Sequence, residues 1–152
     1  MKDRNLEIRR LEAGEEQLAQ DAVLRLVPED ERNGHTPSLV HLRRLLAASS
    51  NYLILALLDG TPIGFAIAYA MPRYDRDGQM AYLYEIGVSK EHRRKGVATH
   101  MVDTLKACMA DKGITSVWVG TEVENTPAVS LYEATGAKLE PLLIHEFWYN
   151  NF

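Results

Sequence analysis

The sequence predicts an α/β (α+β) domain in which a mixed, mostly antiparallel, twisted sheet carries helices on both faces. Two apolar runs flank Asp59-Gly60, a dipeptide that is a strong β-hairpin signal. Elsewhere, segments with apolar residues at helical spacing alternate with strand-like segments. The second half of the chain is predicted to run strand, helix, strand, which favours a crossover within the same sheet.

The first half of the chain begins with a predicted strand over residues 6–11, where apolar and charged side chains alternate. Two later segments place apolar residues three and four positions apart, as the buried face of a helix does. These predicted helices cover residues 15–27 and 38–48. The hairpin strands are predicted over residues 51–58 and 62–71, followed by a polar loop over residues 72–79.

The second half begins with residues 80–88 (MAYLYEIGV), whose aromatic and β-branched side chains predict a central strand. A helix is predicted over residues 95–112, and Gly113 follows it in a typical C-terminal position. The remaining predictions are a strand over 116–121, a helix over 127–135 ended by Gly136, and a last strand over 142–149. We therefore expect one domain over residues 1–152, without repeats or linkers.

Composition excludes several classes of protein. The single cysteine, Cys108, cannot form an internal disulfide, and no Cys/His cluster has zinc spacing, so we expect no metal and a reducing, cytoplasmic location. There is no signal-peptide core in residues 1–10 and no apolar run of membrane-spanning length. The pI of 5.7 argues against nucleic acid as a partner. Residues 120–152 carry the whole net charge of −4.

A basic, glycine-containing segment precedes the helix predicted over 95–112. Residues 89–99 read SKEHRRKGVAT. Helix N-termini leave backbone N–H groups unpaired and carry partial positive charge, and small residues let an anion approach that backbone. The segment therefore predicts an anion site, most simply for a diphosphate, although a solvated basic helix start is an equally good interpretation. Neither the Walker A pattern nor the dinucleotide glycine pattern is present.

Two further features point to a family. Glu85 lies inside an otherwise apolar strand, where desolvation of a carboxylate needs a reason, and residues 125–136 read NTPAVSLYEATG. The pattern R-x-x-G-x-A over residues 93–98 resembles the acetyl-CoA pyrophosphate motif of the GNAT superfamily of N-acetyltransferases. The pattern N-x-x-A-x-x-L-Y-x-x-x-G over residues 125–136 resembles the second signature of that superfamily, and the order of elements is similar over nearly the whole chain.

Residues 82–98 and 127–132 further resemble the aminoglycoside 3-N-acetyltransferase branch of the superfamily. That branch has an aspartate where this chain has Glu85, and an acid where this chain has Glu122. It carries a pair of acids where this chain has Asn125-Thr126. The resemblance therefore supports the reaction, acetyl transfer from acetyl-CoA to a primary amine, more firmly than the acceptor.

The resemblance implies a role for individual residues. The cofactor-binding residues would be Ile86, Gly87 and Val88 beside the pantetheine arm, Arg93, Arg94, Lys95, Gly96, Val97, Ala98 and Thr99 around the diphosphate, and Asn125. Asn125 is equally well placed to cap the following helix. Glu85 would act as the base, through a water, or would instead bind a cationic acceptor or an ion-pair partner. Tyr132 would protonate the leaving thiolate, or would simply pack against its neighbours.

Acidic side chains in the segments expected to flank the thioester predict a cationic acceptor. The predicted acceptor-binding residues are Tyr74, Asp75, Glu122, Glu124 and Glu146. Aminoglycosides, polyamines and lysine-rich peptides all carry the required ammonium groups. Three functions follow: an aminoglycoside 3-N-acetyltransferase, a GNAT enzyme acting on a peptide N-terminus or a polyamine, and a non-catalytic acyl-CoA-binding module. The resemblance also implies a homodimer.

Overall fold

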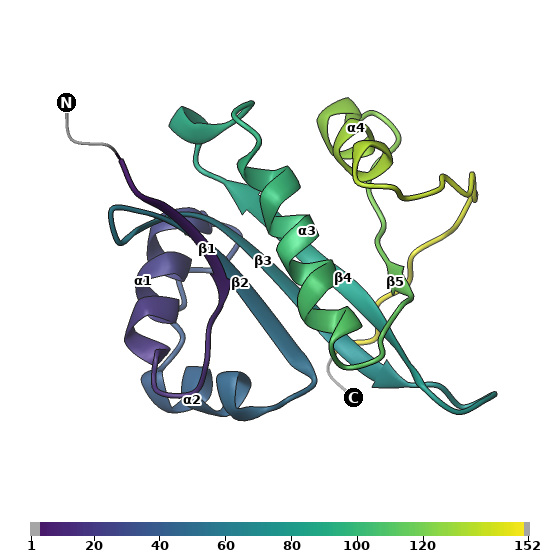
Figure 1. Cartoon of the computed structure of the whole chain (residues 1–152), viewed down its shortest axis with the longest axis horizontal. Coiled ribbons are helices and arrows are strands. Elements are labelled where there is room, and N and C mark those ends of the chain that lie inside the picture. The colour runs from purple at the N-terminus through teal and green to yellow at the C-terminus, as the bar shows by residue number, and fades with distance from the viewer. Residues whose placement is uncertain (1–3, 151–152) are drawn as a thin grey trace.

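A single sheet organises the computed structural model, which describes residues 4–150 (Figure 1). Its strands lie in the order β1-β2-β3-β4-β5. They are β1 (Leu6–Arg10), β2 (Asn51–Leu58), β3 (Thr61–Pro72), β4 (Gln79–Val88) and β5 (Val117–Trp118). The pairs β1–β2, β2–β3 and β3–β4 are antiparallel, and the pair β4–β5 is parallel. The predicted hairpin around Asp59-Gly60 and the mixed, mostly antiparallel sheet are thereby confirmed.

Helices cover both faces of the sheet, as predicted. The helices α1 (Glu16–Leu26) and α2 (Leu39–Ala47) bury apolar residues against β2 and β3 on one face. The helix α3 (Val97–Ala110) buries Met101, Leu105 and Met109 against the opposite face. A short 3-10 turn, Lys90–His92, connects β4 to α3, and α4 (Thr126–Ala134) lies beside α3. None of the helices in residues 4–150 is both long and apolar enough to cross a membrane.

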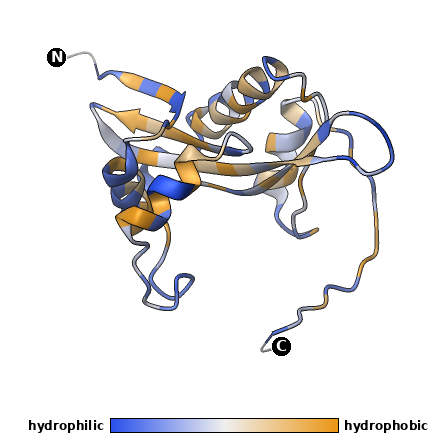
Figure 2. Ribbon diagram, turned by 90° about the horizontal axis from the view of Figure 1, so that it is seen from below, coloured by the Kyte–Doolittle hydropathy of each residue, from blue (hydrophilic) through white to orange (hydrophobic). Residues whose placement is uncertain are grey.

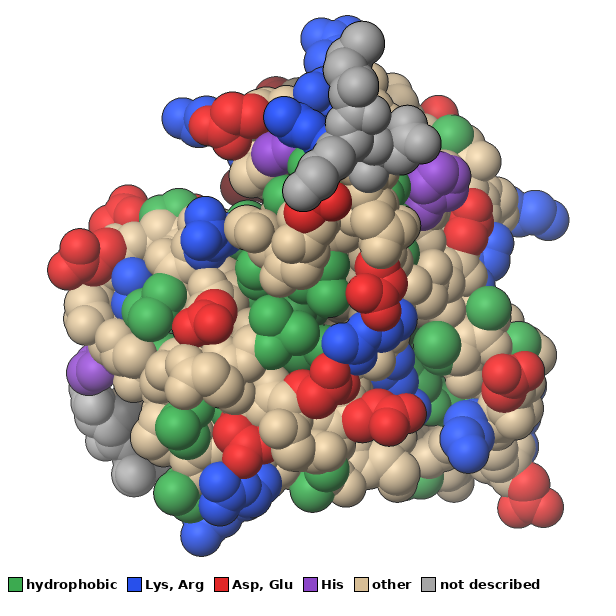
Figure 3. Space-filling view, turned by 60° about the vertical axis from the view of Figure 1, so that its left-hand side comes forward, with side chains coloured by type: hydrophobic (Ala, Val, Ile, Leu, Met, Phe, Trp, Pro, Cys, Tyr) green, Lys and Arg blue, Asp and Glu red, His purple; other side chains and the backbone are tan. Residues whose placement is uncertain are grey.

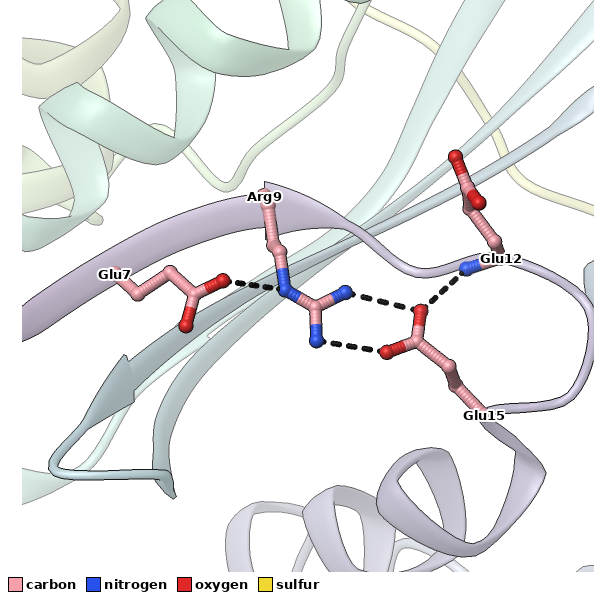
Figure 4. Close-up of polar contacts among 4 residues, drawn as sticks. All are labelled: Glu7, Arg9, Glu12 and Glu15. Carbon is pink, nitrogen blue, oxygen red and sulfur yellow. Dashed lines mark hydrogen bonds and ion pairs between the residues drawn. The ribbon is translucent and has the colours of Figure 1, made fainter.

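An ion-pair network fixes the start of α1 to β1 (Figure 4). The Arg9 guanidinium donates to both carboxylate oxygens of Glu15, over 2.9 and 2.7 Å, and to Glu7 over 2.6 Å. The same Glu15 carboxylate accepts from the backbone N–H of Glu12 over 2.8 Å. The hydrogen bonds from Arg9 hold the pKa of Glu15 below its usual range, although burial acts in the opposite direction. The network therefore joins the first strand to the helix pair that covers the sheet.

The last strand predicted over residues 142–149 is wrong for the described chain. Residues 138–150 have no strand or helix, and Figure 2 shows them leaving the body of the domain and running away from the sheet. Leu143 is 104% exposed. The predicted strand over 116–121 is also shorter, because only Val117 and Trp118 pair with β4. Residues 142–149 have the apolar pattern but pair with no strand among the described residues, and residues 119–121 do not pair with β4.

Candidate active site

The site begins where β4 and β5 separate. The two strands pair only at Ala81 with Val117 and Tyr82 with Trp118, so the rest of β4 has no partner on that side within residues 4–150. A cleft of about 910 Å³ lies beyond this point. Its walls come from the end of β4, the loop before α3 and the first turns of α4. It brings together ten of the predicted cofactor-binding residues: Ile86, Gly87, Val88, Arg93, Arg94, Gly96, Val97, Ala98, Thr99 and Asn125.

The N-terminus of α3 opens into this cleft. Gly96 caps the helix with a left-handed backbone at φ 80° and offers no side chain to the first N–H groups. The first bond of the helix, from the N–H of His100, goes to the Gly96 carbonyl. The N–H groups of Val97, Ala98 and Thr99 therefore lack helical acceptors by geometry, and all three residues line the cleft. Such a helix end favours an anion, so the residues present fit a diphosphate.

The basic side chains of this loop point in different directions. Arg93 donates from Nε to the Val88 carbonyl over 2.9 Å, which ties the loop to the end of β4. Lys95 donates to the Glu91 carbonyl over 3.0 Å and is absent from the cleft wall, so the structure gives it a loop-closing contact. Arg94 lines the cleft from a left-handed backbone at φ 59°, a strained conformation for a residue with a side chain.

Asn125 combines the two roles that the sequence left open. Its Oδ1 accepts from the N–H of Ala128 over 3.2 Å, which caps α4, and the residue also lines the cleft. Sequence reasoning did not assign the other residues of α4 that face the cleft, which are Thr126, Pro127, Ala128, Ser130, Leu131 and Ala134. They occupy one side of a helix whose first residue was recognised, so helical periodicity was the available signal.

Tyr132 lies on another side of α4. It lines a second cavity of about 510 Å³, together with Leu83, Val102, Leu105 and Val119, and it packs against the core under α3. Burial raises the pKa of the Tyr132 phenol, and the neighbouring Tyr82 adds to this effect. A raised pKa favours the protonated phenol. The packing role is satisfied in the structure, and a role as a proton donor stays a prediction.

Glu85 lies next to an irregularity in β4. Ile67 of β3 faces Glu85 and the following Ala68 faces Leu83, so Tyr84 is an extra residue in β4 without a partner in β3. Bulges of this kind re-aim side chains and occur next to active sites. Glu85 is half-buried, and burial raises its pKa, with a further contribution from the negative charge of Glu31. The carboxyl is therefore closer to neutrality than an exposed glutamate.

An aromatic strip, consisting of Tyr69, Tyr82, Tyr84 and Trp118, crosses β3, β4 and β5 beside Glu85. Tyr82 stacks on Trp118 with ring centroids 4.5 Å apart, and Tyr84 meets Tyr82 edge to face at 5.9 Å. Tyr69 meets Tyr84 edge to face at 6.1 Å. These four residues were not predicted as site residues, although the alternation in Tyr82-Leu83-Tyr84 indicates aromatic side chains on one face of a strand.

The predicted acceptor-binding residues do not line the cleft. Tyr74 projects from the β3–β4 loop at full exposure, and Asp75 pairs with Arg73 and Arg76, so its charge is already compensated. Glu122 and Glu124 are exposed in the loop before α4, and Glu146 lies on the C-terminal segment. On the face shown in Figure 3, acidic and basic side chains are interspersed around apolar side chains. A role for these residues in binding the acceptor stays a prediction.

The fold and the cleft define a class of protein: a domain in which an unpaired strand edge lies beside a helix N-terminus that can bind an anion. The chain belongs to the Acetyltransferase (GNAT) family, whose model matches residues 17–137. A curated relative, the L-2,4-diaminobutyric acid acetyltransferase of Streptomyces avermitilis, is 30% identical over 93 residues. That match covers 58% of this chain and 50% of the relative, so the chain spans half of that relative's length.

Solved structures share the fold. An aminoglycoside acetyltransferase, meta-AAC0020 from an uncultured soil metagenomic sample in complex with sisomicin, matches with a TM-score of 0.85 and 23% identity, over 96% of this chain and 97% of that chain. The aminoglycoside N-acetyltransferase AAC(6')-Iy in complex with CoA matches with a TM-score of 0.72 and 22% identity, over 96% and 97%.

Proposed function

We propose that this protein transfers the acetyl group of acetyl-CoA to a primary amine. One observation carries the proposal: a single cleft joins the unpaired edge of β4 to the N-terminus of α3, which no side chain caps. An extended arm can pair with an open strand edge as a further strand would, and a diphosphate suits the helix end. Coenzyme A carries both groups, and the structure of AAC(6')-Iy contains CoA within the same fold.

Different residues of this chain bind acetyl-CoA and move the protons of the proposed reaction. The N–H groups of residues 97–99 hold the diphosphate, Arg94 adds positive charge, and residues 86–88 orient the thioester arm along β4. Glu85, whose pKa is raised by burial and by Glu31, takes a proton from the acceptor ammonium through a water. Tyr132, whose pKa is raised by burial, supplies a proton to the leaving thiolate.

For the acceptor we propose an aminoglycoside. Similarity of fold to aminoglycoside acetyltransferases supports this class, and the sequence resemblance points to the 3-amino group. The 6′-amino group is the second candidate, because the name of AAC(6')-Iy carries that position. The aromatic strip beside Glu85 offers flat surfaces for sugar rings, and Glu85 and Glu31 offer negative charge for ammonium groups. Peptide N-termini and polyamines are the alternatives.

Thiol release from acetyl-CoA tests the reaction with a panel containing sisomicin, spermidine and a peptide with a free N-terminus. We expect release with sisomicin at saturating cofactor, and mass spectrometry with NMR of the product locates the acetyl group at position 3 or 6′. Release with spermidine or the peptide alone would contradict the aminoglycoside proposal. Binding of acetyl-CoA without release for any amine would identify a non-catalytic module.

A further inference from the structure

We infer that Lys106 is a positioning residue of the proposed reaction: from α3, its ammonium holds the C-terminal end of α4 and thereby fixes where the Tyr132 hydroxyl lies. The inference rests on the proposed function, because the place of that hydroxyl matters to turnover only if a leaving thiolate has to be protonated. Lys106 does not line the 910 Å³ cleft, so it acts through Tyr132 and not on the cofactor.

The helix α4 is weakly packed. None of the residues Thr126–Ala134 is buried, whereas α3 buries five of its side chains. Space is open on two sides of α4, because one side lines the 910 Å³ cleft and Tyr132 borders the 510 Å³ cavity. Tyr132 packs against the core under α3, but it is only partly buried there. A helix with so few buried apolar side chains needs further support to keep one position.

A single polar contact supplies that support. The Lys106 Nζ donates to the Thr135 carbonyl over 2.7 Å. Thr135 caps the C-terminal end of α4, where the last carbonyls of a helix lack helical partners and carry partial negative charge, so an ammonium is favourable there. Within residues 4–150, no other hydrogen bond or ion pair joins α4 or its caps to another helix or strand.

The turn that Lys106 holds is bonded directly to Tyr132. The Tyr132 carbonyl accepts from the Ala137 N–H over 2.9 Å and from the Thr135 hydroxyl over 3.0 Å. A shift of this turn therefore moves the backbone of Tyr132. Asn125 caps the opposite end of α4 and lies about 15 Å from Thr135 along the helix axis. Loss of the lysine contact should consequently displace Tyr132 more than the cofactor-binding end of the helix.

Lys106 is well supported for this role. The preceding residue on α3, Leu105, is 1% exposed in the core, so the backbone that carries the lysine is fixed. No carboxylate in residues 4–150 lies within ion-pair distance of the Lys106 ammonium, although Asp103 is close to it along α3. The ammonium is therefore not drawn away from the Thr135 carbonyl by a competing anion.

Thiol-release kinetics test the role. Lys106→Met keeps most of the side-chain length and removes the donor. We expect its kcat to fall about tenfold or more at an unchanged KM for acetyl-CoA, because a displacement of about 1 Å at a reacting group costs up to about 100-fold. Lys106→Arg retains a charged donor and should restore most of kcat. The matched control Lys112→Met removes the same charge from an exposed lysine just beyond α3 and should leave kcat and KM unchanged. Equal kcat values for Lys106→Met and Lys112→Met would overturn the inference.

A double substitution shows whether Lys106 acts through Tyr132. In a chain that already carries Tyr132→Phe, addition of Lys106→Met should lower kcat no further, since both changes remove the same proton transfer. If the two losses of kcat multiply instead, Lys106 acts independently of Tyr132, which contradicts a positioning role.

Amide exchange at neutral pH tests the contact without any need for activity. In Lys106→Met, the N–H groups of residues 135–137 should exchange several-fold faster, because they close the turn that the lysine holds. Those of residues 128–129, at the other end of α4, should keep their rates. Unchanged exchange at residues 135–137 would overturn the inference whatever the activity. Faster exchange there, in a protein that releases no thiol with any amine, would contradict the proposed function and leave the lysine contact established, so the two failures are distinguishable.

Discussion

Replacement of Gly96 by alanine separates the cost of a backbone conformation from the cost of blocking the cleft. Gly96 has φ 80°, and Gly113, beyond the other end of α3, has φ 73°. A Cβ added at either position meets no atom within 4 Å. Each change therefore imposes only the left-handed penalty of about 1–2 kcal/mol on an L-residue. For a chain of this length, we expect a Tm lower by about 2–8 °C in both variants.

The two variants should differ in cofactor binding. The open space beside Gly96 is the cleft itself, whereas Gly113 does not line it. A methyl group at Gly96 would hold the diphosphate away from the N–H groups of residues 97–99. We expect the KM for acetyl-CoA to rise about tenfold, equivalent to about 1.4 kcal/mol, in Gly96→Ala and to stay unchanged in Gly113→Ala.

Urea unfolding and thiol-release kinetics on the same preparations measure both effects. Equal loss of stability with a selective rise in KM supports a diphosphate at the N-terminus of α3. Equal KM values in the two glycine variants would refute the assignment, because the backbone strain is shared and only the position relative to the cleft differs.

Three further substitutions probe the proposed roles. Tyr132→Phe should lower kcat about tenfold or more in thiol release and leave the KM for acetyl-CoA unchanged, since only the phenol proton is removed. Glu31→Gln should move the acidic limb of the pH–rate profile to lower pH, because loss of that negative charge lowers the raised pKa of Glu85, and Asp30→Asn is the matched control. Arg9→Met should cost about 1 kcal/mol or less of unfolding free energy at neutral pH, given the partial exposure of the pair. Because Arg9 lowers the pKa of Glu15, this stabilisation is present above the ordinary carboxyl pKa of about 4.3, and the difference should vanish in urea titrations as the pH falls below it.

The local features of the fold could be predicted because they depend on neighbouring residues in the chain. The β2 strand, Asn51–Leu58, was predicted with its observed bounds, since a dipeptide that favours left-handed backbone separates two apolar runs. The cleft residues of the segment 93–99, which are all of them except Lys95, were predicted together because a helix start places consecutive N–H groups side by side. Each of these signals is complete within about ten residues.

Features that depend on distant partners were not predicted. Residues 142–149 have the composition of a strand, but hydrogen bonding to a neighbour is what makes one, and the described chain provides no neighbour. The residues predicted to bind the acceptor do not line the cleft: Asp75 pairs with arginines, and Glu146 lies on the C-terminal segment. The net charge gives the excess of acidic over basic residues, and only the fold determines which acidic residues lie close together.

The short pairing between β4 and β5 accounts for the open edge of β4 beside the cleft. Because the strands separate after Tyr82 and Trp118, the end of β4 keeps unpaired backbone groups beside the N-terminus of α3, where a thioester arm can lie.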